Sequence, residues 1–183
     1  MLLAPLIVTL RMDPDAAARF TAVRRAHFPA HRNWLDAHIT LFHALPGEQV
    51  DAVLGDVAEV AARTAPFTMP VERVVFLGAG VAYALGSPEA QRLRRALAQR
   101  WDALLGRQDR AKTGPLHITV QNKVAPAVAR ALHDRLAGEI AFVEVRATGL
   151  EVWHYEGGPW RLATSLPFVS SGVCAPVGPG GLA

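Results

Sequence analysis

The stretch "DAHITLFHAL", residues 36–45, decides the fold, because its central part returns as "GPLHITVQNKV" at residues 114–124. Both copies contain His-Ile-Thr followed by apolar residues, and their histidines, His38 and His117, are 79 positions apart. The β-branched and apolar residues of each copy are typical of a strand. A motif that occurs twice in similar surroundings predicts a chain built from two related halves.

Similar elements surround the two copies. A Ser or Asp cap followed by proline predicts a helix before each copy, and a second helix is predicted after each copy. Each unit then ends in strands around a glycine-containing turn, "GAG" in the first unit and "EGGP" in the second. The order helix, His-Ile-Thr strand, helix, hairpin therefore occurs twice.

The repeated hairpin sets the expected fold class, because a hairpin requires antiparallel pairing. We expect an α+β fold with two antiparallel or mixed sheets that face a central cleft, with helices outside and a pseudo-two-fold axis between the halves. Residues 1–168 are expected to form a single bilobal domain, with lobes built approximately from residues 13–86 and 87–168. The Gly/Pro-rich residues 169–183 are expected to be a flexible tail.

Composition narrows the class of protein. The 183 residues are 51% hydrophobic, which is enough to bury one core, and the net charge of +3 is weaker than that of most dedicated nucleic-acid binders. The single cysteine, Cys174, excludes an internal disulfide and a multi-cysteine metal site. The apolar N-terminus is read as a first strand rather than a secretory signal, and no apolar run approaches the ~18 residues of a membrane span. We therefore expect a cytoplasmic protein with no membrane contact and no obligate protein partner.

Strand alternation predicts which side chains lie beside each histidine, because residues i and i+2 of a strand point to the same face. Buried polar groups need partners, so a polar row on a strand otherwise suited to the core predicts a wet cleft or a hydrogen-bond network. The predicted row of the first copy is His38, Thr40 and Phe42, and that of the second is His117, Thr119, Gln121 and Lys123.

If the pseudo-two-fold brings the two rows together, two imidazoles flank one space. Histidine titrates near neutrality, so one ring can act as a base while the other acts as an acid. Hydroxyls and an ammonium between them would bind an oxyanion, a set that suits in-line displacement at phosphorus without a metal or cofactor. A zinc site generally needs three protein ligands, and neither motif offers an Asp, Glu or Cys. The remaining histidines are expected to be helix, loop or surface residues: His27, His31, His43, His133 and His154.

At these residues the chain resembles the 2H phosphoesterase superfamily, and within it the 2′-5′ RNA ligase-like branch. The resemblance rests on "HITLF" at 38–42, "HITV" at 117–120 and the duplicated layout, and it covers residues 4–168. It implies a bilobal α+β fold in which the two motifs face each other across a central cleft. It also implies a metal-independent phosphodiesterase that acts on 2′,3′-cyclic phosphate ends of RNA or nucleotides, with reversible 2′-5′ ligation as a related activity.

The resemblance further implies that His38 and His117 are the catalytic pair and that Thr40 and Thr119 hold the phosphate. By the same resemblance His117 is the base and His38 the acid, and these roles exchange in the ligating direction. An RNA end or a cyclic nucleotide is then the expected binding partner.

Two further segments carry candidate substrate contacts. Trp153 and Tyr155 share a strand face and Trp160 follows the turn, so these aromatics can stack on a base or belong to the core. The polar loop "GRQDRAKTGP", which precedes the second motif, carries Arg107, Arg110 and Lys112. These cations bind phosphates that flank the reacting one, or they are simply solvated.

Two other functions remain open from the sequence. The chain can be a non-catalytic module that binds nucleotides or RNA ends, although such a module has no need of an acid–base pair. It can also be a phosphodiesterase for a small cyclic phosphate that is not RNA, which the modest charge permits.

Overall fold

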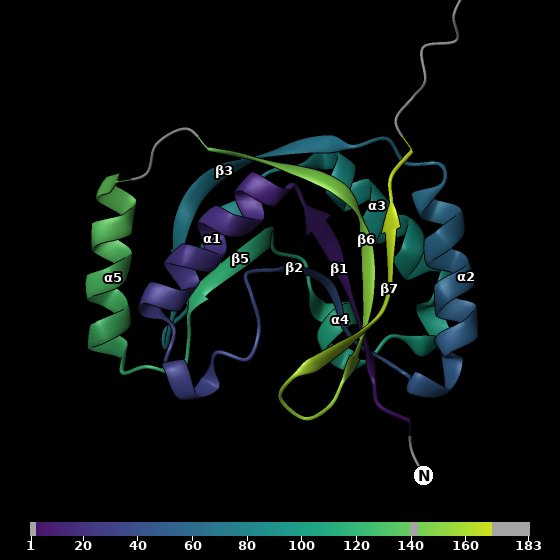
Figure 1. Cartoon of the computed structure of the whole chain (residues 1–183), viewed down its shortest axis with the longest axis horizontal. Coiled ribbons are helices and arrows are strands. Elements are labelled where there is room, and N and C mark those ends of the chain that lie inside the picture. The colour runs from purple at the N-terminus through teal and green to yellow at the C-terminus, as the bar shows by residue number, and fades with distance from the viewer. Residues whose placement is uncertain (1–2, 140–142, 170–183) are drawn as a thin grey trace, which may run out of the picture.

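The structure is a computed structural model that describes residues 3–139 and 143–169, and its main elements follow the predicted order apart from a short helix in the loop before the second motif (Figure 1). All of the predicted tail except Val169 lies outside the described residues. The first half contains β1 (Leu6–Met12), α1 (Pro14–His27), β2 (Ile39–Leu45), α2 (Val50–Ala61) and β3 (Phe67–Phe76). The second contains β4 (Val81–Leu85), α3 (Pro88–Arg100), α4 (Arg107–Ala111), β5 (Leu116–Gln121), α5 (Pro126–Glu139), β6 (Glu144–Tyr155) and β7 (Trp160–Pro167).

The two helices that precede the motifs begin where the sequence predicts. Asp13 caps α1 by accepting a hydrogen bond from the Ala16 backbone N–H at 2.9 Å. Ser87 caps α3 in the same way by accepting from the Ala90 backbone N–H at 3.1 Å. Each cap lies just after a strand of the sheet, so both helices leave the sheet directly and return as the motif strands β2 and β5.

All strands belong to one antiparallel sheet of seven strands, in the order β1-β2-β5-β4-β3-β6-β7. Strand β1 also pairs with β6, so the first six strands close into a barrel and β7 is added at the outer edge of β6. The α+β class is confirmed, but two separate facing sheets are not. The physical reason is the length of β6, whose first part pairs with β3 and whose remainder pairs with β1 and β7.

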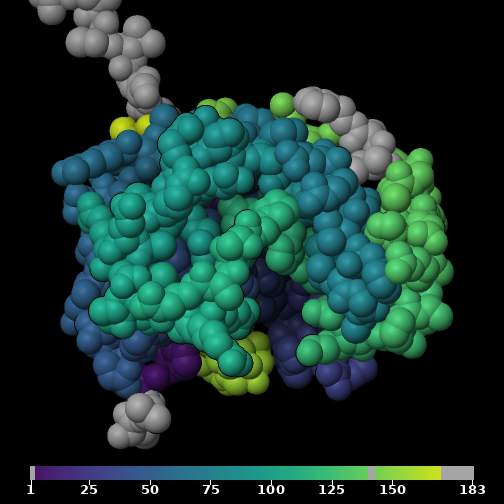
Figure 2. All heavy atoms as spheres, turned by 180° about the vertical axis from the view of Figure 1, so that it is seen from behind, coloured from purple at the N-terminus to yellow at the C-terminus, as the bar shows by residue number. Residues whose placement is uncertain are grey.

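Helices cover the outside of the barrel. Helices α1 and α5 lie on one side and α2 and α3 on the other (Figure 1). From behind, the surface is hollowed between the segment that leads into β5 and the β3–β4 hairpin (Figure 2). Among the described residues no helix is both long enough and apolar enough to cross a membrane.

The barrel has an internal two-fold symmetry. Exchanging β1 with β4, β2 with β5 and β3 with β6 leaves the order of the closed ring unchanged. The axis passes between Ile39 and Ile118, where β2 meets β5, and between Met69 and Val145, where β3 meets β6. The predicted duplication is therefore present in the strand register, where it is far more regular than in the sequence.

The junction of β2 and β5, called the seam below, has the least backbone pairing of the barrel. Ile39 opposite Ile118 is its one paired position, whereas every other junction in the ring has at least four. Both isoleucine side chains are fully buried. Side-chain packing therefore holds the seam more than hydrogen bonding does.

Cations from outside the sheet bind carbonyl groups of the motif strands. The guanidinium of Arg24 in α1 donates to the Thr119 carbonyl at 2.8 Å, and that of Arg94 in α3 donates to the Leu41 carbonyl at 3.2 Å. A backbone carbonyl that is buried needs a partner, so these arginines replace the ladder bonds that the seam lacks. Burial lowers the pKa of Arg24 to about 10, which leaves its charge intact at neutral pH.

If the two isoleucines hold the seam together, truncating either should be costly and their effects should be coupled. Ile39→Ala and Ile118→Ala should each reduce the free energy of unfolding by about 2–5 kcal/mol in urea titrations. The double variant should deviate from additivity by roughly 0.5–3 kcal/mol, because the side chains are in contact. Met69→Ala lies at the other end of the axis and should combine additively with Ile39→Ala. Additive behaviour of the isoleucine pair would contradict this view of the seam.

Candidate active site

The seam brings the two His-Ile-Thr motifs together in a crossed arrangement. Because Ile39 opposes Ile118 in an antiparallel pair, His38 lies opposite Thr119 and Thr40 lies opposite His117. The isoleucines point into the core, so these four side chains occupy the other face, where all are partly exposed. Diagonal neighbours of this kind are roughly 7–8 Å apart. Two imidazoles and two hydroxyls therefore surround one small space.

The first motif strand contains a β-bulge immediately after Thr40. Thr40 is paired with Thr9 of β1, but Phe42 is paired with Val8, so Leu41 is an extra residue. The bulge turns Phe42 into the core, where it is fully buried and its ring centroid lies 5.0 Å from that of Trp101. Simple alternation had placed Phe42 beside the histidine, and the bulge removes it from that row.

The second motif strand contains a bulge at the equivalent position. Thr119 is paired with Ala82 of β4, whereas Gln121 is paired with Val81, so Gln121 turns away from the face of Thr119. Its side chain is only 4% exposed, and its Oε1 atom has no hydrogen-bond partner among the described residues. Lys123 lies beyond the end of β5 with a φ of 61° and is exposed, so the alternation that placed it in the row does not extend to it.

The first bulge brings His43 to the face of His38 and Thr40 instead of Phe42. The His43 Nδ1 atom lies 2.8 Å from the Oδ1 atom of Asp109, a residue of α4 that is only 2% exposed. The Asp109 carboxylate also accepts the backbone N–H groups of His43 and Ala44. Sequence reasoning missed this pair, because the loop before the second motif was not expected to contain a helix that packs on β2.

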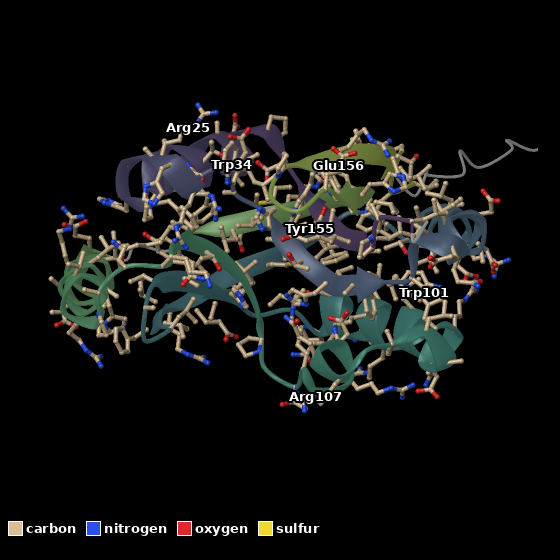
Figure 3. All side chains as sticks on the ribbon, turned by 90° about the horizontal axis from the view of Figure 1, so that it is seen from below. Arg25, Trp34, Trp101, Arg107, Tyr155 and Glu156 are labelled. Carbon is tan, nitrogen blue, oxygen red and sulfur yellow. The ribbon has the colours of Figure 1, made fainter. Side chains whose placement is uncertain are left out.

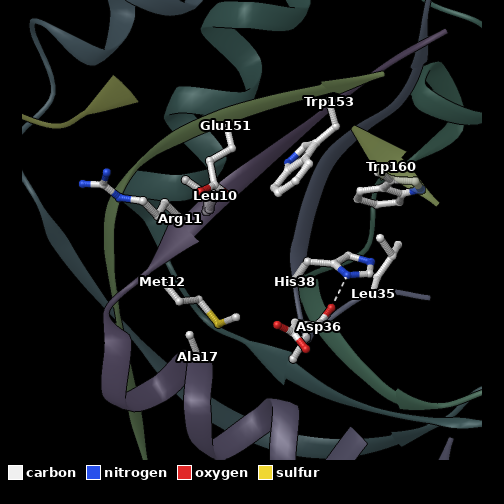
Figure 4. A pocket seen from close by; sticks show the side chains of 11 residues that line it. Leu10, Arg11, Met12, Ala17, Leu35, Asp36, His38, Glu151, Trp153 and Trp160 are labelled. Carbon is white, nitrogen blue, oxygen red and sulfur yellow. Dashed lines mark hydrogen bonds between the residues drawn. The ribbon is translucent and has the colours of Figure 1, made fainter. Parts of the chain in front are cut away.

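Aromatic residues of β6 and β7 stand beside His38. The ring centroids of Trp160 and His38 are 4.7 Å apart, and Trp153 donates its indole N–H to the Thr9 hydroxyl at 3.0 Å. His38, Glu151 and both tryptophans line a cavity of about 180 Å³, called the His38 cavity below (Figure 4). Tyr155 is 41% exposed and lies further out on the hairpin, on the same side of the molecule as Trp34 (Figure 3).

Comparison with known proteins agrees with this arrangement. The 2'-5' RNA ligase superfamily matches this chain over residues 12–159, a range that includes both motifs. The chain belongs to the 2′-5′ RNA ligase superfamily. A comparison with curated proteins gave no match.

Solved structures show the same fold at low sequence identity. TT0787 of Thermus thermophilus has a TM-score of 0.64 and 14% identity, with 91% of this chain and 99% of that chain covered. LigT of E. coli in complex with 3'-AMP has a TM-score of 0.61 and 15% identity, with 92% and 99% covered. The predicted assignment to the 2H phosphoesterase superfamily is confirmed, and these structures share its LigT-like fold over most of this chain.

The His38 ring of this superfamily member is oriented by a carbonyl two residues earlier. His38 donates from Nδ1 to the Asp36 carbonyl at 2.8 Å, which leaves Nε2 free to accept a proton. For His117 the backbone of Pro115 acts in the same sense, since it raises the pKa of the ring against the larger effect of burial.

The surroundings of the two rings oppose their protonation. Burial lowers the pKa of His38 to about 4, with smaller contributions from the positive charges of Arg24, His117 and His43, and the Asp36 carbonyl partly offsets them. Burial also lowers the pKa of His117, and the nearby Lys112 ammonium lowers it further. In the ligand-free protein both imidazoles are therefore mostly neutral at pH 7.

Of the three cations predicted in the loop before the second motif, only Lys112 extends to the motif strands. Its Nζ atom donates to the Thr40 carbonyl at 2.7 Å, and burial lowers its pKa to about 8. Arg110 instead pairs with Asp102, and Arg107 projects outward from α4 (Figure 3). Within residues 3–139 and 143–169, no group of three His, Cys, Asp or Glu side chains could hold a metal ion.

The buried carboxylate of Asp109 should support this part of the site measurably. Burial alone would raise its pKa, but the hydrogen bonds from His43 and Ala44 outweigh burial and leave the pKa lowered. Asp109→Asn should therefore reduce the free energy of unfolding at pH 7 by about 1.5–3 kcal/mol, the usual contribution of hydrogen bonds to a charged group. Asp102→Asn is the matched control, since the Asp102 side chain is 75% exposed.

The sign of the pH dependence follows from the lowered pKa. A carboxylate whose pKa is depressed on folding stabilises the protein above its unfolded pKa, here near 3.8, and loses that contribution as the pH falls through the folded pKa. In urea titrations, the difference in the free energy of unfolding between wild type and Asp109→Asn should become smaller below pH 3.8. A difference that is constant with pH would show that the carboxylate charge is not responsible.

Proposed function

We propose that this protein is a metal-independent phosphodiesterase that opens 2′,3′-cyclic phosphate ends of RNA or nucleotides by two-histidine acid–base catalysis. The observation that carries the proposal is the crossed arrangement at the seam, where His38, Thr40, His117 and Thr119 share one face across a single antiparallel pair. LigT, which has the same fold, has been crystallised with 3'-AMP, with ATP and with phosphate. These complexes support a nucleotide phosphate as the ligand proposed for this chain.

The proposed reaction is an in-line displacement in which one imidazole removes a proton from water. The water oxygen forms a new bond to phosphorus while one ring P–O bond breaks, and the second imidazole donates its proton to the leaving ribose oxygen. The hydroxyls of Thr40 and Thr119 hold the non-bridging oxygens. The products are a phosphate monoester and a free ribose hydroxyl, and the two imidazoles exchange their protonation states.

The electrostatics of the site favour His38 as the base and His117 as the acid in hydrolysis. With its pKa lowered to about 4, His38 is the ring that remains neutral most readily, and its free Nε2 can accept a proton. This assignment reverses the one that the family resemblance implies. The roles exchange for the reverse, ligating reaction.

A base of the substrate is proposed to occupy the His38 cavity. At about 180 Å³ the cavity is smaller than sites that enclose a whole small molecule, which are about 300–1,000 Å³. It can therefore receive only part of a nucleotide, and the indole rings of Trp153 and Trp160 offer surfaces on which a base stacks. Tyr155, which is more exposed, would contact a neighbouring base of a longer substrate.

Replacing either imidazole should remove most of the activity. His38→Ala and His117→Ala should each lower kcat for a 2′,3′-cyclic nucleotide by roughly 10²–10⁴-fold, the usual contribution of a general acid or base. The double variant should lose far less than the product, because the rings act as a unit. Thr40→Ala and Thr119→Ala should have milder effects, and EDTA should leave the wild-type rate unchanged.

Several outcomes would refute the proposal. Loss of activity on chelation would indicate a metal-assisted mechanism, and full activity of one variant would remove that histidine from the pair. Tight binding of nucleotides without turnover of any cyclic substrate would favour the binding module. Turnover of non-nucleotide cyclic phosphates in preference to nucleotides would favour the small-substrate alternative.

The pH profile should be displaced to the acid side of neutrality. The rising limb of kcat/KM should reflect the base, with a pKa of about 4 for His38, and the falling limb should reflect His117, whose pKa lies below 6.5. The maximum should therefore fall between these values. The profile of kcat should lie at higher pH, because a bound anionic phosphate raises the pKa of both rings. A maximum of kcat/KM above pH 7 would contradict these roles.

A further inference from the structure

The internal symmetry gives the His38 cavity a counterpart beside His117. This second cavity, called the His117 cavity below, has a volume of about 210 Å³ and is lined in part by Arg73, Lys112 and His117. The strand register relates the walls of the two cavities residue by residue. Val75 occupies the position that corresponds to Glu151 in the other half. Val75 is paired with Ala82 of β4, and Glu151 is paired with Thr9, the equivalent residue of β1.

The two cavities differ in charge. The His38 cavity is lined by the carboxylates of Asp36 and Glu151, by two indole rings and by Arg11, whose guanidinium is taken up by hydrogen bonds to Thr148 and Ser165. Of the residues that line the His117 cavity none is acidic, and its polar side chains are the basic ones of Arg73, Lys112 and His117. One half of the symmetric site is therefore suited to a base and the other to an anion.

The cations of the His117 cavity are only weakly neutralised. The Lys112 ammonium donates to the Thr40 carbonyl, and no carboxylate among the described residues lies within 4 Å of it. Arg73 has a loose contact of 3.6 Å with Glu72, and its side chain is 58% exposed. Both side chains can therefore bind a ligand without breaking a strong ion pair.

Among the described residues β7 has no counterpart in the other half of the barrel, and this explains why Arg73 has space. The equivalent position in the other half is Gly149, where a Cβ atom would collide with the Leu166 carbonyl of β7. In the first half β3 carries no added strand at this position among the described residues, so the long side chain of Arg73 is accommodated there.

Arg73 reaches the His117 cavity from the side away from the seam. Arg73 is paired with Ala84, and Ala84 is paired with His117, so the three lie in one row across β3, β4 and β5. Two strand spacings separate Arg73 from His117, roughly 10 Å between their backbones. The small side chain of Ala84 leaves the space between them open.

We propose that the His117 cavity is an anion subsite in which Arg73 and Lys112 bind a second phosphate of the substrate, distinct from the phosphate under attack. This inference rests on the proposed function, because the proposed function places the reacting phosphate at the seam. It defines the preferred substrate as a nucleotide or RNA end that carries at least two phosphates. The second phosphate belongs either to the same nucleoside or to the neighbouring one.

Equilibrium binding tests the subsite independently of turnover. Adenosine 3′-phosphate is compared with adenosine 3′,5′-bisphosphate, which adds a phosphate to the same nucleoside. A 2′-5′-linked adenosine dinucleotide is compared with the same dinucleotide bearing a terminal 3′-phosphate, which adds it to the neighbouring nucleoside. Isothermal titration calorimetry gives the affinity ratio within each pair for wild type, Arg73→Gln, Arg73→Lys and Arg92→Gln.

Wild type should bind the ligand with the extra phosphate about 10-fold or more tightly in at least one pair, since hydrogen bonds to charged groups are strong. Arg73→Gln should remove most of that preference, and Arg73→Lys should restore part of it. Arg92→Gln removes the same charge from an exposed residue of α3 and should leave the ratio unchanged. The pair that shows the effect identifies which nucleoside carries the second phosphate.

The proposal is overturned if wild type shows no preference in either pair, or if Arg73→Gln retains it. If Arg73→Gln and Arg92→Gln reduced the affinity ratio equally, the proposal would also be overturned, because equal reductions would indicate a general effect of net charge. If cyclic substrates are not turned over but the bisphosphate preference is present and depends on Arg73, the proposed reaction fails while the subsite stands. Turnover without any such preference refutes the subsite alone.

Discussion

The pair formed by Ile39 and Ile118 is the constraint on which the rest of the structure depends. It lies on the two-fold axis, it is the one paired position between β2 and β5, and it fixes the register of both motifs. A shift of the register by one residue would point the histidines into the core and the isoleucines into the cleft. Two buried apolar side chains thus determine where four polar ones meet.

The sparse pairing of the seam has an electrostatic consequence. Carbonyl groups of the motif strands accept hydrogen bonds from Arg24, Arg94 and Lys112. Three positive charges are thereby held close to the strands that carry the imidazoles. Burial lowers the pKa of both imidazoles. Under the proposed function, a bound phosphate would raise these pKa values again, so that the site would bind negative charge first and take up a proton with it.

Much of this architecture could be predicted from the sequence. The duplicated motif, the helix caps at Asp13 and Ser87 and the antiparallel hairpins each have a local signature, and all are present. That the two motifs lie next to each other could be predicted only from the duplication, because neither motif by itself indicates its partner. The resemblance to the 2H phosphoesterases supplied the superfamily, which the match over residues 12–159 confirms.

The features that could not be predicted depend on partners distant in sequence. A β-bulge is defined by the opposing strand, so neither the turning of Phe42 and Gln121 nor the exposure of His43 to the site could be read from alternation. The closure of the barrel depends on the reach of β6, and the pairing of His43 with Asp109 depends on how α4 docks on β2. In each case the local sequence is compatible with more than one arrangement.

Strand β7 has no symmetry-related counterpart among the described residues, and this affects the orientation in which a ligand can bind. A fully symmetric ring would accept an elongated ligand equally well in either of two opposite orientations, and half of all encounters would present each of them. Because β7 supplies Trp160 and supports Trp153 on one side alone, a reversed ligand would meet Leu77 and Arg73 where an indole wall should be. One added strand thus gives a direction to a site whose chemical groups come in equal pairs.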